Sequence, residues 1–146
     1  MTVDVVSTIT IARPVEAVAS YTTDPSNAPE WYVNIDTVEW VTSPPAQVGS
    51  KVAFVARFLG RRLAYTYEFI ELEPGTRLVM RTADGPFPME TTYMWTAEGS
   101  DATRMTLCNR GEPTGFSKVT GPFMATAMRR ANRKDLARLQ SILEAT

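Results

Sequence analysis

Asp135 is a carboxylic acid at a position where the surrounding pattern predicts an apolar side chain. Apolar residues recur at steps of three and four from Met124 to Leu143, which is the spacing of one face of a long helix. A buried carboxylate without partners is very costly in free energy. Two interpretations of Asp135 therefore stay open. It is either a proton donor or ligand anchor in a cavity, with a raised pKa, or a structural group held by a backbone amide, a Trp or Tyr side chain, or an Arg on the sheet.

Tyrosine and arginine side chains on the predicted strands are the other candidates for chemistry. Tyr65, Tyr67 and Tyr93 could offer hydroxyls to a ligand carbonyl or phenol, although such residues more often pack and bond locally. Arg81 could point inward, or it could pair with Glu68 on the neighbouring strand. The candidate catalytic residues are thus Asp135, Tyr67, Tyr93 and Arg81, and the other strand residues that alternation allows to point inward are Glu71, Glu90, Arg57, Arg104 and Asn109.

The sequence contains no histidine. This excludes Ser–His and Cys–His nucleophile pairs, histidine metal sites and histidine general bases. Any chemistry would rely on Asp, Glu, Tyr, Lys or Arg, so the absence weakens the case for an enzyme without excluding one. We expect neither a metal ion nor a cofactor.

Length and charge limit the class of protein. With 146 residues we expect a single domain over 1–146. Fifteen basic and sixteen acidic residues give a net charge of −1, which does not favour nucleic-acid binding. The sequence has no membrane-spanning run and no signal-peptide pattern, so we expect a cytoplasmic protein, monomeric or homodimeric, without integral membrane association. Basic residues on the predicted outer helix face are interpreted as solvated: Arg129, Arg130, Arg133, Lys134 and Arg138.

The elements that must position these residues follow an α+β order. A β-branched strand is predicted at Val3–Ile11, and two short helices follow, one opened by Pro14 and one over Pro25–Trp31. A long helix begins near Pro122 and ends at Ala145. Between them, turn signals separate six extended segments: Thr37–Val41, Lys51–Leu59, Arg61–Leu72, Arg77–Thr82, Met89–Thr96 and Arg104–Arg110. A curved seven-stranded antiparallel sheet wrapped around the long helix satisfies this order.

Three stretches resemble the SRPBCC superfamily, the START and birch-pollen-allergen-like helix-grip proteins. They are RPVEAVASYTTDPSNAPEW after the first strand, YEFIELEPGTRLVMRT in the middle, and ANRKDLARLQSILE in the last helix. Together they cover nearly the whole chain in the family's order, and the sequence is most similar to the bacterial polyketide cyclase/dehydrase-like group. The resemblance also favours the structural interpretation of Asp135.

The resemblance implies a hollow between sheet and long helix, with an entrance near the short helices. Small-ligand cavities of this kind typically measure about 300–1,000 Å³. Trp31 and Tyr32 would either gate that entrance or plug the gap between helix and sheet. The residues expected to contact a ligand are Trp31, Phe54, Phe58, Tyr65, Tyr67, Met80, Tyr93, Met105, Phe123, Met124, Met128 and Ala131.

Three functions are consistent with these features. The first is the binding of a small hydrophobic molecule, lipid-like or polyketide-like, by a carrier or sensor. The second is a cyclase, aromatase or dehydratase that uses buried Asp, Glu, Tyr and Arg groups on a polyketone. The third is a protein-interaction module. A carrier needs only apolar walls, an enzyme needs converging polar groups in the pocket, and an interaction module needs an exposed apolar patch.

Overall fold

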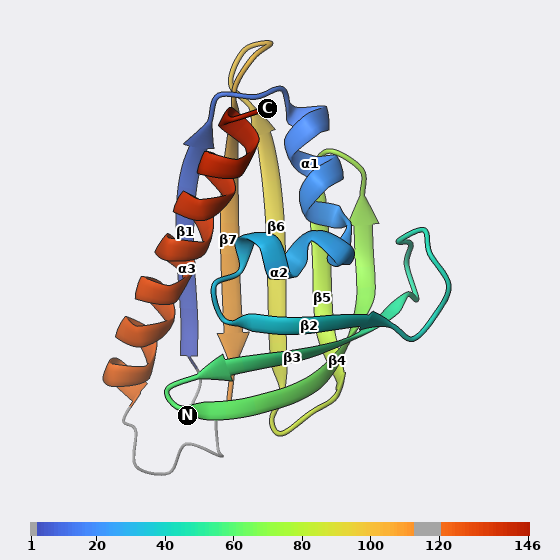
Figure 1. The fold of residues 1–146 in the computed structure, drawn as a ribbon, viewed down its shortest axis with the longest axis vertical. Coiled ribbons are helices and arrows are strands. Elements are labelled where there is room, and N and C mark those ends of the chain that lie inside the picture. Colours follow the sequence, from blue (N-terminus) through green and yellow to red (C-terminus); the bar gives the residue numbers. More distant parts are fainter. Residues whose placement is uncertain (1–2, 113–120) are drawn as a thin grey trace.

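The computed structural model describes residues 3–112 and 121–146. Its strands form one sheet, three helices lie against it, and a single 3-10 turn, η1, precedes α2 (Figure 1). In chain order the elements are β1 (Val3–Ile11), α1 (Val15–Thr23), η1 (Pro25–Asn27), α2 (Ala28–Trp31), β2 (Ile35–Trp40), β3 (Lys51–Phe58), β4 (Arg61–Glu73), β5 (Arg77–Asp84), β6 (Met89–Ala97), β7 (Thr103–Gly111) and α3 (Gly121–Glu144).

The strand order is β1-β7-β6-β5-β4-β3-β2, and every neighbouring pair is antiparallel. Strand β4 spans thirteen residues, and its register with β5 shifts twice, between Thr66 and Tyr67 and between Phe69 and Glu71. Such irregularities bend a strand and increase its twist. The half of the sheet formed by β2, β3 and β4 therefore turns across the front of β5, β6 and β7 (Figure 1).

The two halves of α3 differ in the size of their inward side chains. Leu136, Leu139 and Leu143 are fully or almost fully buried and belong to the main hydrophobic core. Each such Leu contributes about 1.5–3 kcal/mol when it is taken out of water. The preceding half presents Met128 and Ala131, whose side chains are flexible or small. The helix thus closes the core at its C-terminal end and leaves space nearer its start.

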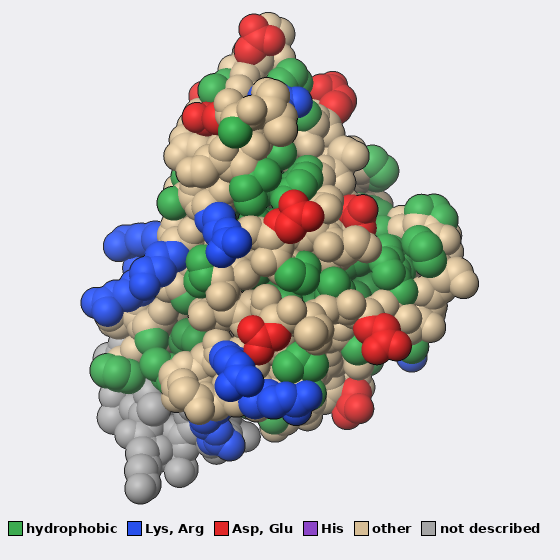
Figure 2. All heavy atoms as spheres, viewed as in Figure 1, with side chains coloured by type: hydrophobic (Ala, Val, Ile, Leu, Met, Phe, Trp, Pro, Cys, Tyr) green, Lys and Arg blue, Asp and Glu red, His purple; other side chains and the backbone are tan. Residues whose placement is uncertain are grey.

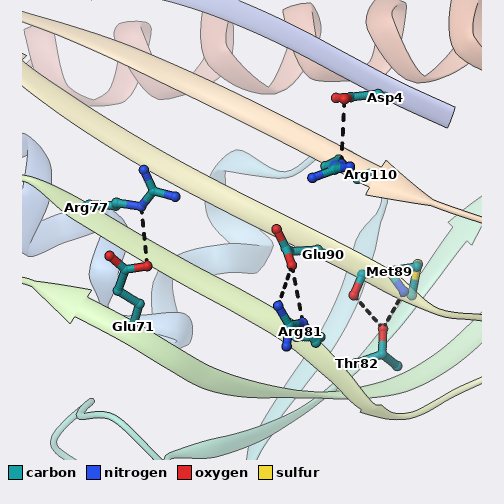
Figure 3. Close-up of polar contacts among 8 residues, drawn as sticks. All are labelled: Asp4, Glu71, Arg77, Arg81, Thr82, Met89, Glu90 and Arg110. Carbon is teal, nitrogen blue, oxygen red and sulfur yellow. Dashed lines mark hydrogen bonds and ion pairs between the residues drawn. The ribbon is translucent and has the colours of Figure 1, made fainter. Parts of the chain in front are cut away.

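The outward face of the sheet carries an alternating row of charges. The strand registers align Asp4, Arg110, Glu90, Arg81 and Glu68 across five neighbouring strands. Arg81 donates to Glu90 at 3.0 Å, and Arg110 lies 3.6 Å from Asp4 (Figure 3). Opposite charges on adjacent strands attract, although exposed pairs contribute little to stability. This row identifies the convex face as the solvated one.

The α+β helix-grip fold predicted from the sequence is confirmed. Strand β2 begins at Ile35 instead of Thr37, because Ile35 pairs with Ala56 before a register shift. The basic face of α3 is solvent-facing as predicted, with Lys and Arg side chains gathered along the helix (Figure 2) and Arg129 half-buried. No helix in the described part of the chain is long and apolar enough to cross a membrane.

Candidate functional site

A cavity of about 160 Å³ lies between the concave face of the sheet and α3. It is smaller than the expected 300–1,000 Å³, and aromatic rings of β3 and β4 pack against one another in its wall. Phe54 stacks on Tyr65 with ring centroids 5.5 Å apart, and Tyr65 meets Tyr67 edge-on at 5.1 Å. Among the predicted ligand-contacting residues, nine of twelve line the cavity: Phe54, Phe58, Tyr65, Tyr67, Met80, Tyr93, Met124, Met128 and Ala131.

Trp31, Met105 and Phe123 do not line this cavity. Trp31 is completely buried and packs against Tyr32, with ring centroids 4.1 Å apart, so it plugs the gap between α2 and the sheet. Met105 is also completely buried, in the closed part of the core. Phe123 is 59% exposed at the start of α3, beside a separate surface groove. The cavity wall has Tyr32 in place of Trp31.

Asp135 lies in the cavity wall with one hydrogen bond that fixes its position. The backbone N–H of Val33, just after α2, donates to Asp135 Oδ1 at 2.9 Å. The carboxyl is 3% exposed, and its burial raises the pKa of Asp135 from the ordinary 3.8 to about 7, opposed by the Val33 bond and the positive charge of Arg138. Asp135 is thus held by a backbone amide and also carries the raised pKa that the alternative interpretation required.

A group of tyrosine hydroxyls lies in the same cavity as Asp135. The hydroxyl oxygens of Tyr32 and Tyr93 are 2.6 Å apart and join the segment after α2 to β6. Burial raises the pKa of Tyr32, Tyr65 and Tyr93, and the negative charge of Asp135 contributes to each increase. These phenols therefore stay neutral at physiological pH and can donate hydrogen bonds to a ligand.

A chain of polar side chains crosses the cavity wall from β4 to α3. The Tyr67 hydroxyl lies 2.8 Å from Thr91 Oγ1, which donates to Asn109 Oδ1 at 2.6 Å. Asn109 Nδ2 in turn donates to Asn132 Oδ1 at 3.0 Å. Burial raises the pKa of Tyr67 to about 12. The chain ends at Asn132 Nδ2, a buried donor with no partner among the described residues.

The structure brings together only part of the set of catalytic candidates. Asp135, Tyr67 and Tyr93 line the cavity, whereas Arg81 lies on the convex face of the sheet and forms an ion pair with Glu90. The sequence predicted that Arg81 could pair with Glu68. Glu68 is the residue opposite Arg81 in the strand register, but Arg81 forms its ion pair with Glu90. The other charged strand residues that could have pointed inward are not catalytic candidates either. Four of them form ion pairs outside the cavity: Glu71, Glu90, Arg57 and Arg104. Glu68 lies opposite Arg81 in the charge row of the convex face.

Asn132 and Thr91 are site residues that the sequence reasoning missed. Asn132 follows Met128 by four residues and precedes Asp135 by three, so the helical spacing that singled out Asp135 also placed Asn132 on the inner face. Thr91 gave no such signal, since a threonine is common on either face of a strand. Among the described residues, no three Cys, Asp or Glu side chains gather in a way that could hold a metal ion.

Solved structures of several other proteins share this fold at low sequence identity. A START superfamily protein from Mycobacterium smegmatis superposes with a TM-score of 0.83 at 16% identity, with 97% of each chain covered. The Zhui aromatase/cyclase from Streptomyces sp. R1128 superposes with a TM-score of 0.81 at 16% identity, with 99% of this chain and 94% of that chain covered. The ginseng major latex-like protein 151 from Panax ginseng superposes with a TM-score of 0.75 at 14% identity, with 96% of each chain covered. At these identities the likeness concerns the fold alone.

The family relationship comes from the sequence itself. No protein with a curated description matches the chain. A family model described as "Polyketide cyclase / dehydrase and lipid transport" matches residues 2–144, which is almost the whole chain. Together with the SRPBCC-type fold, this match assigns the protein: the chain belongs to the polyketide cyclase / dehydrase and lipid transport family.

Proposed function

We propose that this protein binds a small hydrophobic molecule in the cavity between its sheet and α3, as a carrier or sensor. The observation that carries the proposal is the cavity itself, whose wall is formed mainly by apolar side chains, aromatic rings and methionines among them. Apolar pockets with a few placed polar groups are the usual sites of small-molecule binding. The resemblance of the fold to START proteins also supports this function.

The volume limits the size of the ligand. At about 160 Å³ the cavity is close to the engineered apolar cavities of ~150 Å³ that bind benzene. A ligand of about one ring therefore fits without rearrangement. A two-ring molecule such as 2-naphthol fits when side chains of the wall move, and Met124 and Met128 on α3 are the most adaptable of these.

A paired substitution on α3 tests whether this cavity binds ligands. Ala131 lines the cavity, whereas Ala137 on the same helix is exposed. We expect Ala131→Trp to abolish binding of 2-naphthol, measured by its fluorescence, and Ala137→Trp to leave binding unchanged. Circular dichroism must show both variants folded. Unchanged 2-naphthol affinity in folded Ala131→Trp would contradict the proposal, and native mass spectrometry of protein from its own host would identify a co-purifying ligand.

One observation favours a second function, that of a cyclase, aromatase or dehydratase. Asp135, with a pKa of about 7, shares the cavity with the neutral phenols of Tyr32, Tyr65 and Tyr93. A carboxylate of this pKa could take a proton from a CH2 group between two carbonyls at neutral pH, while a phenol donates to the enolate oxygen that forms.

The carrier and the enzyme respond differently to Asp135→Asn. The amide keeps the shape of the carboxyl but cannot accept the substrate proton. A carrier therefore retains 2-naphthol binding and shows no turnover in either form. An enzyme retains binding and loses the ring closure of an aryl triketone, followed by absorbance of the aromatic product. Turnover in the parent protein would favour the enzyme.

A further inference from the structure

We infer that Asn132 is a ligand-anchoring residue whose Nδ2 donates a hydrogen bond to a neutral acceptor oxygen, so that the preferred ligand is a compact hydrophobic molecule bearing a ketone or aldehyde. This inference rests on the proposed ligand-binding function and deepens it. It assigns one wall residue to one functional group of the ligand.

The polarity of the hydrogen-bond chain leaves Asn132 with a free donor. Thr91 gives its only hydroxyl proton to Asn109 Oδ1, so the Tyr67 hydroxyl must donate to Thr91. Asn109 then donates to Asn132 Oδ1. This bond fixes the orientation of the Asn132 amide, so that its Nδ2 points away from Asn109. Each group in the chain therefore holds the next, and Asn132 is positioned before any ligand arrives.

Because the free Nδ2 donor of Asn132 is buried, its lack of a hydrogen-bond partner points to a ligand. Four buried side-chain polar atoms lack a hydrogen-bond partner among the described residues, and they belong to Ser7, Trp31, Arg77 and Asn132. Only Asn132 also lines the cavity. The Asn132 side chain is part of a residue that is 4% exposed, so bulk water does not satisfy its amide. Since buried donors in proteins are almost always paired, a ligand atom is the partner that this position lacks.

The neighbouring groups select a neutral acceptor. Asp135 lies three residues further along α3 on the same face, and its partly ionised carboxyl would repel an anionic ligand. Arg57 and Arg110 border the cavity, but their side chains form exposed ion pairs with Asp36 and Asp4. A carbonyl oxygen accepts from Asn132 without adding charge. The volume of about 160 Å³ restricts the rest of the molecule to roughly one ring.

Two probes of the same shape test the inference directly. Acetophenone and α-methylstyrene differ only in a carbonyl oxygen against a CH2 group. We expect the protein to bind acetophenone about tenfold more tightly than α-methylstyrene by isothermal titration, a difference of about 1.4 kcal/mol. Asn132→Leu should remove this preference, because leucine has a similar size and no donor. Gln140→Leu is the matched control, since it removes a side-chain amide of the same helix that donates to Thr10 outside the cavity wall, and it should retain the preference.

A nuclear magnetic resonance measurement keeps the test valid if Asn132→Leu does not fold. In the parent protein, acetophenone should shift the Asn132 side-chain amide protons downfield, and α-methylstyrene should not. Equal affinity for the two probes, or a preference that persists in Asn132→Leu, would overturn the inference while the proposed function stands. Binding of neither probe would overturn the inference, and failure of 2-naphthol to bind as well would remove the proposed function.

Discussion

Asp135 both contacts the backbone after α2 and carries a raised pKa in the cavity wall. Its hydrogen bond from Val33 holds the segment after α2 against α3, and its burial places its pKa near neutrality. The bond from a backbone amide is the contact that the structural interpretation predicted, and the raised pKa is the property that the functional interpretation required; the functional role stays a prediction. A backbone amide positions the carboxyl, and burial makes its charge expensive.

The raised pKa of Asp135 predicts that the protein is more stable at mildly acidic pH. The folded state binds the proton with a pKa of about 7, whereas the unfolded chain has the ordinary value of 3.8. The stabilisation is therefore fully present below the unfolded value and is lost as pH rises through 7. We expect the free energy of unfolding to fall by up to about 1.4 kcal/mol per pH unit between pH 5 and 7, measured by urea titration.

Two variants of Asp135 separate the contributions of charge and contact. Asp135→Asn keeps an acceptor for Val33 and has no charge, so its stability should vary less between pH 5 and 7 than that of the parent. Asp135→Ala leaves the buried Val33 N–H unpaired, and at pH 5 it should cost about 1–3 kcal/mol. An Asp135→Ala protein as stable as the parent at pH 5 would contradict the structural role.

Helix α3 is tied at its end to the segment between β1 and α1. Arg13 Nη1 donates to the carbonyl of Leu143 at 2.8 Å, and the Ala12 N–H donates to the Glu144 carboxylate, also at 2.8 Å. The last carbonyls of a helix lack intrahelical partners, and a cation there also interacts favourably with the helix dipole. The first strand and the last helix are therefore joined by both packing and polar contacts.

Arg13→Ala should weaken this junction. We expect a loss of about 1–2 kcal/mol in the free energy of unfolding, because the Leu143 carbonyl loses its charged donor. Arg133→Ala, on the exposed side of the same helix, is the matched control and should change stability by less than about 0.5 kcal/mol. Equal thermal melts for the two variants would show that the Arg13 contact does not stabilise the fold.

At the level of the elements, the sequence was most informative where local rules decide the outcome. Turn residues and β-branched runs predicted seven strands in order, and the spacing from Met124 to Leu143 predicted α3. The bends in β4 were not predictable, because register shifts depend on pairing with β5. The role of Asn132 depends on its contact with Asn109 on β7, a pairing across the fold that no local pattern contains.

Across the whole molecule, the two faces of the sheet divide the candidate chemistry. The concave face holds the tyrosines and the amide chain, and the convex face holds the alternating charges that include Arg81 (Figure 3). Alternation along β5 could not assign Arg81 to either face without knowing which neighbours are buried. The sequence therefore identified the candidate polar residues but not the face on which each one lies. The folded sheet assigns each of them to the concave or the convex face.

Arg81→Gln tests this division. The exposed ion pair with Glu90 should contribute less than about 1 kcal/mol to stability. Because the side chain lies outside the cavity wall, the affinity for 2-naphthol should be the same as in the parent. Fluorescence titration and a thermal melt measure both quantities. A loss of 2-naphthol affinity in Arg81→Gln would contradict the placement of this residue on the convex face.

The plug formed by Trp31 also gives the protein an internal optical reporter. The indole is completely buried and touches Tyr32, which lines the cavity, so a bound molecule lies one ring away from the chromophore. Trp40 is partly exposed and donates to Ser26 at 3.1 Å, outside the cavity wall. Occupancy of the cavity should therefore change the emission of Trp31 but not that of Trp40. A Trp40→Phe variant keeps Trp31 and the buried Trp95, which lies 6.2 Å from the cavity-lining Tyr93, and it would report ligand uptake and release by its own fluorescence, in real time and without a label.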